Sequence, residues 1–313
     1  MSKILKRALA LSIGIAVVPV GLELGYRAVR LSGLSPTTHP AYVRHDTELG
    51  WSYRPKTSAP HTSDVFDVEV TINEQGFRGP DWPSSTGDKP CVLVLGDSFA
   101  FGWGVEFDES FSARLAQNTG WDVRNAAVSG YGTDQQRLLL ERLLQDVEPD
   151  VVVSVFCWND LFESSSDVVY GKHKPFYMRG PDGLQLSGVP VPQAFLARSS
   201  YAARAYHKWR WQRAHAARRI DREAEWRLVL DLYREEKRLL GDVPLLIVSD
   251  RGRLASLAEE SEGIAHLDLR DVFEGFKEPI AFPNDGHWTP GAHDKIARAL
   301  GELAATLLAD GRW

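Results

Sequence analysis

A run of five apolar residues, Cys91 to Leu95, leads directly into Gly96-Asp97-Ser98. An uninterrupted apolar run of this length is typical of a strand buried on both faces of a sheet, and the glycine indicates where it ends. The turn that follows would present the hydroxyl of Ser98 at the edge of that sheet. A Gly-Asp-Ser sequence alone is usually only a turn. The function of Ser98 therefore depends on which other groups the chain brings to it.

Similar strand patterns recur along the chain and alternate with helical ones. Apolar strands are predicted at 91–95, 122–128, 150–157, 243–249 and 264–269, and helices near 109–118, 133–147, 225–241 and 291–308. Alternation of strand and helix predicts a parallel sheet with helices on both faces. We therefore expect an α/β chain with three layers, α/β/α, and about five parallel strands. Open sheets of this kind build their sites at the carboxyl ends of the strands.

The residues at or near those strand ends could together carry out nucleophilic catalysis. A serine hydroxyl becomes a nucleophile when a histidine takes its proton, and a carboxylate must orient that histidine. Ser98, His287 and Asp285 can fill these roles. A glycine amide and an asparagine side chain are donors that an oxyanion requires, and Gly130 and Asn159 each follow a strand pattern.

The order of these blocks resembles that of the SGNH hydrolases, also called the GDSL family. The resemblance covers about residues 88–308 and implies the flavodoxin-like fold of that family. It implies Ser98 as nucleophile and His287 as base. It also implies an oxyanion hole formed by the Ser98 and Gly130 amides and the Asn159 side chain.

Two positions depart from the common family pattern. Cys157 stands where a glycine is usual, two residues before Asn159, and Asn284 stands where many members have the triad acid. The spacing Asp285-x-His287-Trp288 is instead similar to the membrane-anchored bacterial branch that contains the alginate O-acetylation proteins, so we assign Asp285 as the acid. An α/β-hydrolase fits less well, because its nucleophile elbow requires glycine where this chain has Ala100.

Composition limits the other classes of function. The 313 residues are 43% hydrophobic with a formal net charge of −6, which gives no general argument for a nucleic-acid partner. The nine histidines show no metal-ligand spacing, and no glycine-rich cofactor loop is present, so we expect neither metal nor organic cofactor. Cys91 and Cys157 lie in apolar runs, and a disulfide between them stays open. His293 is expected to be structural.

The N-terminal residues 1–30 predict an uncleaved signal anchor. Basic residues precede an uncharged segment, Ala8 to Leu22, and this order favours a cytoplasmic N-terminus with the rest of the chain outside. The enzyme would then be membrane-anchored, with its catalytic domain periplasmic or extracellular. A cleaved signal peptide and a soluble amphipathic helix remain as alternatives.

Residues 31–89 predict a small β extension that packs on the rest. The alternation at 65–72, followed by Asn73-Glu74-Gln75-Gly76, predicts a hairpin. Residues 90–313 would form the hydrolase domain, interrupted by a helical insertion at 161–224 that is placed to act as a lid. The basic and aromatic run between Arg198 and Arg227 could bind an anionic glycan or lipid headgroup, or could be a solvated helical face.

These patterns predict an extracytoplasmic serine esterase without a cofactor. Its expected substrate is an acyl ester, most simply an acetyl ester, of a carbohydrate or envelope polymer. An O-acyltransferase with the same triad and a catalytically idle glycan-binding or assembly module are the alternatives. Asp97 and Asp160 are expected to hold turns. Three tryptophans could line the cleft or pack in the core: Trp103, Trp158 and Trp288.

Overall fold

The computed structural model describes residues 41–84, 87–181, 183–193 and 221–310, with isolated positions 20–21, 24–25 and 213. Nearly all of the predicted signal anchor and most of the basic and aromatic run lie outside these residues. Within the described residues, no helix is both long and apolar enough to cross a membrane.

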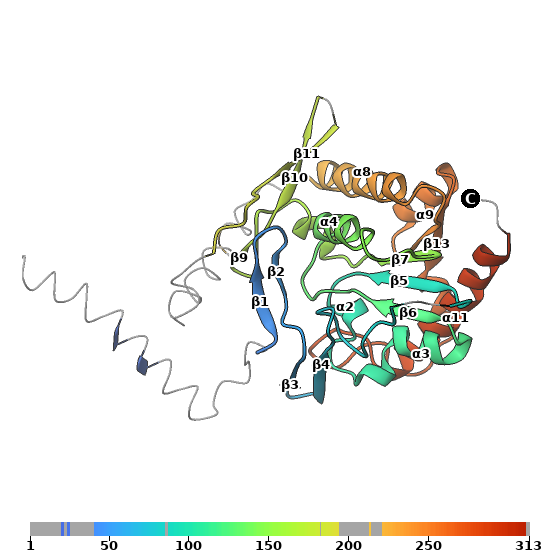
Figure 1. Cartoon of the computed structure of the whole chain (residues 1–313), viewed down its shortest axis with the longest axis horizontal. Coiled ribbons are helices and arrows are strands. Elements are labelled where there is room, and N and C mark those ends of the chain that lie inside the picture. The colour runs from blue at the N-terminus through green and yellow to red at the C-terminus, as the bar shows by residue number, and fades with distance from the viewer. Residues whose placement is uncertain are drawn as a thin grey trace, which may run out of the picture.

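Five parallel strands form the central sheet (Figure 1) in the spatial order β13-β12-β7-β5-β6. Their bounds are β5 (Cys91–Leu95), β6 (Asp122–Asn125), β7 (Val151–Val155), β12 (Leu245–Ser249) and β13 (Ile264–Asp268). Read from β6, the strands follow the chain in the order 2-1-3-4-5, which is the flavodoxin-like arrangement. The predicted fold class is therefore confirmed.

The sheet forms where it was expected because its three central strands are almost entirely apolar. All five residues of β5, of β7 and of β12 are buried. Helices cover both faces: α3 packs against α11, and α4 packs against α8 (Figure 1). The long helices are α3 (Phe111–Thr119), α4 (Thr133–Leu143), α8 (Arg222–Leu240), α9 (Gly252–Glu260) and α11 (Pro290–Asp310). Only α9 was not predicted from the sequence.

Four short helical segments lie in the connections between the longer elements. They are α2 (Ser98–Phe101), η1 (Phe107–Glu109), α5 (Asp160–Glu163) and α10 (Leu269–Val272). Of these, α2 and α5 start at or directly after two of the predicted site residues, Ser98 and Asn159.

The N-terminal extension forms two antiparallel hairpins that share the core of the α/β sheet. They are β1 (Val43–Asp46) with β2 (Gly50–Tyr53), and β3 (Thr57–Thr62) with β4 (Asp67–Ile72). The strand that pairs with β4 is therefore β3, which precedes it in the chain. The turn predicted after residue 72 is followed only by a single bridge between Ile72 and Arg78. Trp51, Tyr53 and Phe77 belong to the same apolar cluster as the central strands.

The described part of the insertion forms two hairpins after the end of α5, whereas a helical insertion was expected; most of residues 194–220 lie outside the described part. In the described part, β8 (Val168–Val169) pairs with β9 (Lys172–His173), and β10 (Phe176–Gly180) pairs with β11 (Gly183–Ser187). Each strand partner lies close in sequence, so the two hairpins form from local contacts. Whether the insertion acts as a lid stays a prediction.

Candidate active site

Ser98, His287 and Asp285 are joined by hydrogen bonds in a single row. Ser98 Oγ lies 2.7 Å from His287 Nε2, and His287 Nδ1 lies 2.6 Å from Asp285 Oδ1. When Nδ1 donates its proton to Asp285, the lone pair on Nε2 can accept the proton of Ser98. Ser98 is partly exposed, so a substrate can reach its hydroxyl.

The turn between β5 and α2 determines where Ser98 lies. Gly96 has φ of 151°, and a Cβ there would lie 2.5 Å from that of Ala100, so the position requires glycine. Asp97 caps α2 by accepting a hydrogen bond of 2.9 Å from the amide of Phe99. Gly96 and Asp97 together place Ser98 at the first position of this short helix.

The loop before α11 brings Asp285, and not Asn284, against the histidine. The Phe282 amide donates to the His287 carbonyl over 2.9 Å and closes the loop. Asn284 and Gly286 adopt left-handed φ values of 63° and 91°, which turn the chain tightly around Asp285. The pKa of Asp285 is lowered, chiefly by its hydrogen bond to His287. An ionised Asp285 is suited to stabilise a protonated His287.

The family resemblance assigns three donors to the oxyanion, the amides of Ser98 and Gly130 and the side chain of Asn159. In the part of the chain that the structure describes, neither the Ser98 amide nor the Gly130 amide donates a hydrogen bond. Asn159 Nδ2 donates to Asp97 Oδ2 over 2.8 Å, and the Asn159 side chain is also hydrogen-bonded to Glu163. Asp97 was expected only to hold a turn. It does so, and it also orients Asn159.

Cys157 fits its position although the family usually has glycine there. Its φ is not among the positive values in the chain, so a side chain causes no backbone strain. The turn is held by Asp160, whose carboxylate accepts from the Cys157 amide over 3.2 Å and whose own amide donates to the Cys157 carbonyl over 3.0 Å. Cys91 and Cys157 are both free and buried, so the two do not form a disulfide.

Aromatic side chains surround His287 from several elements. Phe99 lies 4.7 Å from the histidine ring between centroids, and Trp103 stacks on it at 5.4 Å. Trp103 in turn contacts His61 of β3 at 4.0 Å, so the N-terminal extension supports the catalytic histidine through Trp103. The sequence alone did not suggest this role for the extension.

The other two tryptophans have different environments. Trp288 is 6% exposed and packs between Phe99 and Phe111. Trp158 is 62% exposed beside Asn159. The buried His293 accepts a hydrogen bond from the Phe111 amide at 3.2 Å, as a structural histidine does.

Two fully buried carboxyl groups, Asp97 and Glu163, are hydrogen-bonded to Asn159, and the sequence did not predict their burial. Burial raises the pKa of Asp97 and raises that of Glu163 to about 8. Glu163 is hydrogen-bonded to the Tyr170 hydroxyl at 2.5 Å. The ring of Tyr170 borders Gly130, where a Cβ would lie 3.1 Å from it. A carboxyl group on a helix start gives no periodic signal, so only the structure reveals this set.

A family model described as the GDSL-like lipase/acylhydrolase family matches residues 94–295. The chain belongs to this family. The matched range includes Ser98, Gly130, Asn159 and His287, the residues to which the resemblance assigns catalytic roles.

Comparison with solved structures gives GDSL-type folds at low sequence identity. A family 3 carbohydrate esterase of Clostridium thermocellum is 13% identical over 72% of this chain and 100% of its own, with a TM-score of 0.43. The salicylyl-acyltransferase SsfX3 of a tetracycline biosynthetic pathway is 12% identical over 71% of this chain and 57% of its own, with a TM-score of 0.41. A search of curated proteins found no match.

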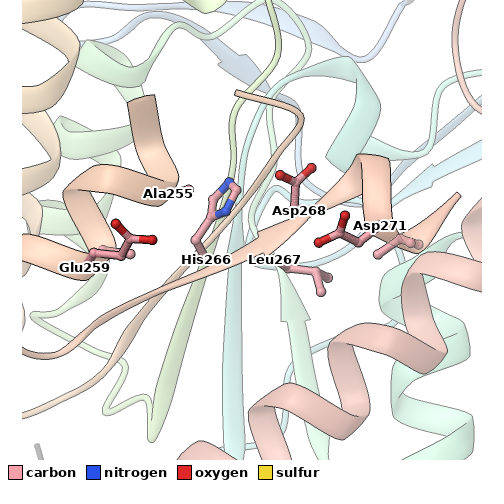
Figure 2. A pocket seen from close by; sticks show the side chains of 8 residues that line it. Ala255, Glu259, His266, Leu267, Asp268 and Asp271 are labelled. Carbon is pink, nitrogen blue, oxygen red and sulfur yellow. The ribbon is translucent and has the colours of Figure 1, made fainter. Parts of the chain in front are cut away.

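A second Ser-His contact lies outside the family site. Ser249 Oγ is 2.8 Å from His266 Nε2. Figure 2 shows His266 on β13 in a hollow that Glu259, Asp268 and Asp271 also line. Ser249 is completely buried, so no substrate can reach its hydroxyl. No group of His, Cys, Asp or Glu among the described residues is arranged to hold a metal ion.

Proposed function

We propose that the chain is a serine esterase that cleaves acyl esters, most simply acetyl esters, of a carbohydrate or envelope polymer. The observation that carries this proposal is the hydrogen-bonded row of Ser98, His287 and Asp285 beside the unoccupied amides of Ser98 and Gly130. Such a row activates a hydroxyl, and such donors stabilise an oxyanion. No metal or organic cofactor takes part in the proposed reaction.

The reaction proceeds in two halves. Ser98 Oγ attacks the ester carbonyl while its proton passes to His287 Nε2, and the Ser98, Gly130 and Asn159 donors hold the oxyanion. Collapse of this intermediate breaks the ester bond, and the departing alcohol takes the proton from His287. Water then gives its proton to His287 and attacks the acyl-enzyme. The carboxylic acid leaves, and the proton returns to Ser98.

An O-acyltransferase is the second candidate, because a sugar hydroxyl can replace water in the second half without any change in the residues. Water exclusion around the acyl-enzyme would decide between the two. A catalytically idle module is the weaker candidate. It gives no reason for the hydrogen bonds that join Ser98, His287 and Asp285.

The test is hydrolysis of 4-nitrophenyl acetate and release of acetate from acetylated glycans by the full chain. Ser98→Ala and His287→Ala should each lower kcat by about 10³-fold or more without unfolding the protein. Asp285→Ala should be severely impaired and Asn284→Ala only mildly, since Asp285 alone is bonded to His287. Wild-type activity in the Ser98→Ala chain would refute the serine mechanism. Transfer of acetate to an added sugar in preference to water would favour the acyltransferase.

For location, we propose that residues 1–30 anchor the protein in a membrane with the catalytic domain outside the cytoplasm. The basic residues before the uncharged segment support this proposal. A reporter enzyme fused after residue 313 should be active only in an extracytoplasmic compartment. Cytoplasmic activity of that reporter would overturn the proposed topology.

A further inference from the structure

The tip of the β8–β9 hairpin borders the oxyanion glycine. Tyr170 and Gly171 connect the two strands with left-handed φ values of 52° and 75°, as in a two-residue type I′ turn. This turn presents the Tyr170 ring to Gly130, where an added Cβ would lie 3.1 Å from the ring. The hairpin therefore forms one wall beside the place where the substrate carbonyl would lie.

Lys172, the first residue of β9, lies on the next part of that wall. Its Nζ is 4.4 Å from the ring centroid of Trp51. An edge of the same ring would be 3.5 Å from a Cβ on Gly130, and the indole is held by a 3.1 Å hydrogen bond from Nε1 to the Ser129 carbonyl. One rigid ring thus contacts both the oxyanion glycine and the Lys172 ammonium.

The charge of Lys172 is compensated only in part, by the face of the Trp51 ring beneath its ammonium. No described carboxylate forms an ion pair with it, and Glu163 is the acidic group that acts on its pKa. Burial raises the pKa of Glu163 to about 8, so this neighbour is neutral at pH 7. The next lysine along the chain, Lys174, is by contrast completely buried and paired with Asp134.

An unpaired cation that is partly withdrawn from water has a cost in free energy. Burial lowers the pKa of Lys172 to about 8, which leaves the ammonium mostly charged at pH 7. A ligand anion placed against it would recover this energy. The alternative is an aliphatic stem that only packs on Trp51 with its ammonium in water.

We propose that Lys172 forms a subsite for an anionic group on the carbohydrate, so that the preferred substrates are acetyl esters of sugars bearing a carboxylate or a phosphate. This inference rests on the proposed esterase function. An acetyl group carries no charge, so the anion must belong to the sugar. The residue then determines specificity and takes no part in the chemical step.

The experiment compares three acetylated sugars that carry the ester on the same hydroxyl: a neutral methyl glucoside, a methyl glucuronide with its carboxylate free, and a glucose phosphate. The full chain should show a kcat/KM about 10-fold higher for the anionic esters than for the neutral ester, because their KM is lower while kcat is the same. Lys172→Met should remove this preference and leave the neutral ester unchanged. Lys172→Arg should retain part of it. The exposed Lys295 of α11 provides the matched control, and Lys295→Met should behave as the wild type.

A second measurement does not depend on turnover. Ser98→Ala protein should bind methyl glucuronide more tightly than methyl glucoside, and about 0.5 M NaCl should weaken that difference. Equal binding of the two sugars would overturn the inference. An equal loss of kcat/KM for the neutral and the anionic esters in Lys172→Met would overturn it as well. If the wild type cleaves no ester while the binding preference persists, the proposed reaction fails and the anionic subsite stands. If only one anionic ester is preferred, that result identifies the ligand as carboxylate or phosphate.

Discussion

Asn159 has two different partners for one amide nitrogen. Asp97 holds one proton of Nδ2 at 2.8 Å, and a hydrogen bond from Nδ2 to the substrate oxygen would be strongest when that oxygen becomes negative. The same carboxylate caps the helix that begins at Ser98. A single buried aspartate therefore coordinates the nucleophile and an oxyanion donor, which explains why Asp97 is buried in spite of its charge.

The first prediction is that Asn159→Ala lowers kcat and leaves KM nearly unchanged. Removal of one oxyanion donor typically costs about 10²- to 10³-fold in kcat, because the bond is strongest in the transition state. Steady-state kinetics on 4-nitrophenyl acetate would measure the effects on kcat and on KM separately. A matched change, Cys157→Gly, should retain activity, since Cys157 contributes no hydrogen-bond donor to the oxyanion. A rise in KM at constant kcat for Asn159→Ala would make Asn159 a substrate-positioning group instead.

A second prediction at the residue scale concerns pH and stability. Burial raises the pKa of Glu163 from 4.5 to about 8, so between these values the folded chain holds a proton that the unfolded chain has lost. The free energy of unfolding must then fall as pH rises through that window. Glu163→Gln removes this titration. Its stability should exceed that of the wild type at pH 8 by about 4 kcal/mol, with little difference near pH 4.5.

Thermal unfolding of both proteins at pH 4.5 and pH 8 would measure this effect. Glutamine can still accept the hydrogen bond from Tyr170, so the contact itself is preserved. The exposed Glu141 of α4 provides the control, because Glu141→Gln should leave the pH dependence as it is. Parallel pH profiles for Glu163→Gln and the wild type would show that Glu163 is ionised in the folded protein.

At the scale of elements, the β3–β4 hairpin takes part in the architecture of the site. His61 contacts Trp103, and Trp103 stacks on His287 and also contributes to the low pKa of Asp285, after the hydrogen bond from His287. Phe66, in the turn of the hairpin, packs on His61 from the other side. The hairpin is therefore expected to limit the movement of the catalytic histidine.

We predict that Trp103→Ala lowers kcat by about 10-fold or more, because small displacements of a catalytic group are costly. The pH profile of kcat should shift as well, since Trp103 contacts both His287 and Asp285. Trp103→Phe should restore part of the rate. The control is Trp82→Ala, which removes a ring stacked on Phe77 and should affect stability more than kcat. An unchanged kcat and pH profile in Trp103→Ala would limit Trp103 to a packing role.

At the scale of the whole molecule, the N-terminal extension and the α/β sheet share a single core. Tyr42, Trp51 and Tyr53 are each at most 2% exposed, within the cluster that includes the central strands. Arg78 is also buried. It donates hydrogen bonds to the carbonyls of Phe101, the last residue of α2, and of Gly102 and Val105, which follow α2. The extension is thus a structural part of the catalytic domain and not a spacer.

A chain that begins at residue 41 should fold and retain esterase activity, whereas one that begins at residue 90 should not fold. Loss of each buried aromatic side chain costs about 2–3 kcal/mol. Several such losses together approach the total stability of a domain, about 5–15 kcal/mol. Circular dichroism and thermal unfolding of the two truncated chains would check this. A cooperative transition in the chain from residue 90 would show that the sheet is stable alone.

The sequence by itself determined the central sheet and the ends at which the chemistry lies. Strands buried on both faces require nearly continuous apolar runs, so the three central strands were visible locally, and the carboxyl ends of parallel strands meet at one edge. The blocks around Ser98, Gly130, Asn159 and His287 were therefore predictable. The choice of Asp285 over Asn284 came from its spacing to His287, and the loop geometry around Asn284 and Gly286 agrees with that choice.

Only the tertiary structure decided which groups surround that edge. The contacts of His61 with Trp103, of Tyr170 with Gly130 and of Lys172 with Trp51 join segments that share no periodicity in the sequence. The ionisation of the titratable side chains near the site also depends on burial, and a local sequence pattern cannot specify the burial of a single polar residue. Hydrophobic periodicity predicts which face of a helix or strand is buried, but it does not predict which other segment of the chain packs on that face. For that physical reason the nucleophile was predictable from the sequence, and the walls of its site were not.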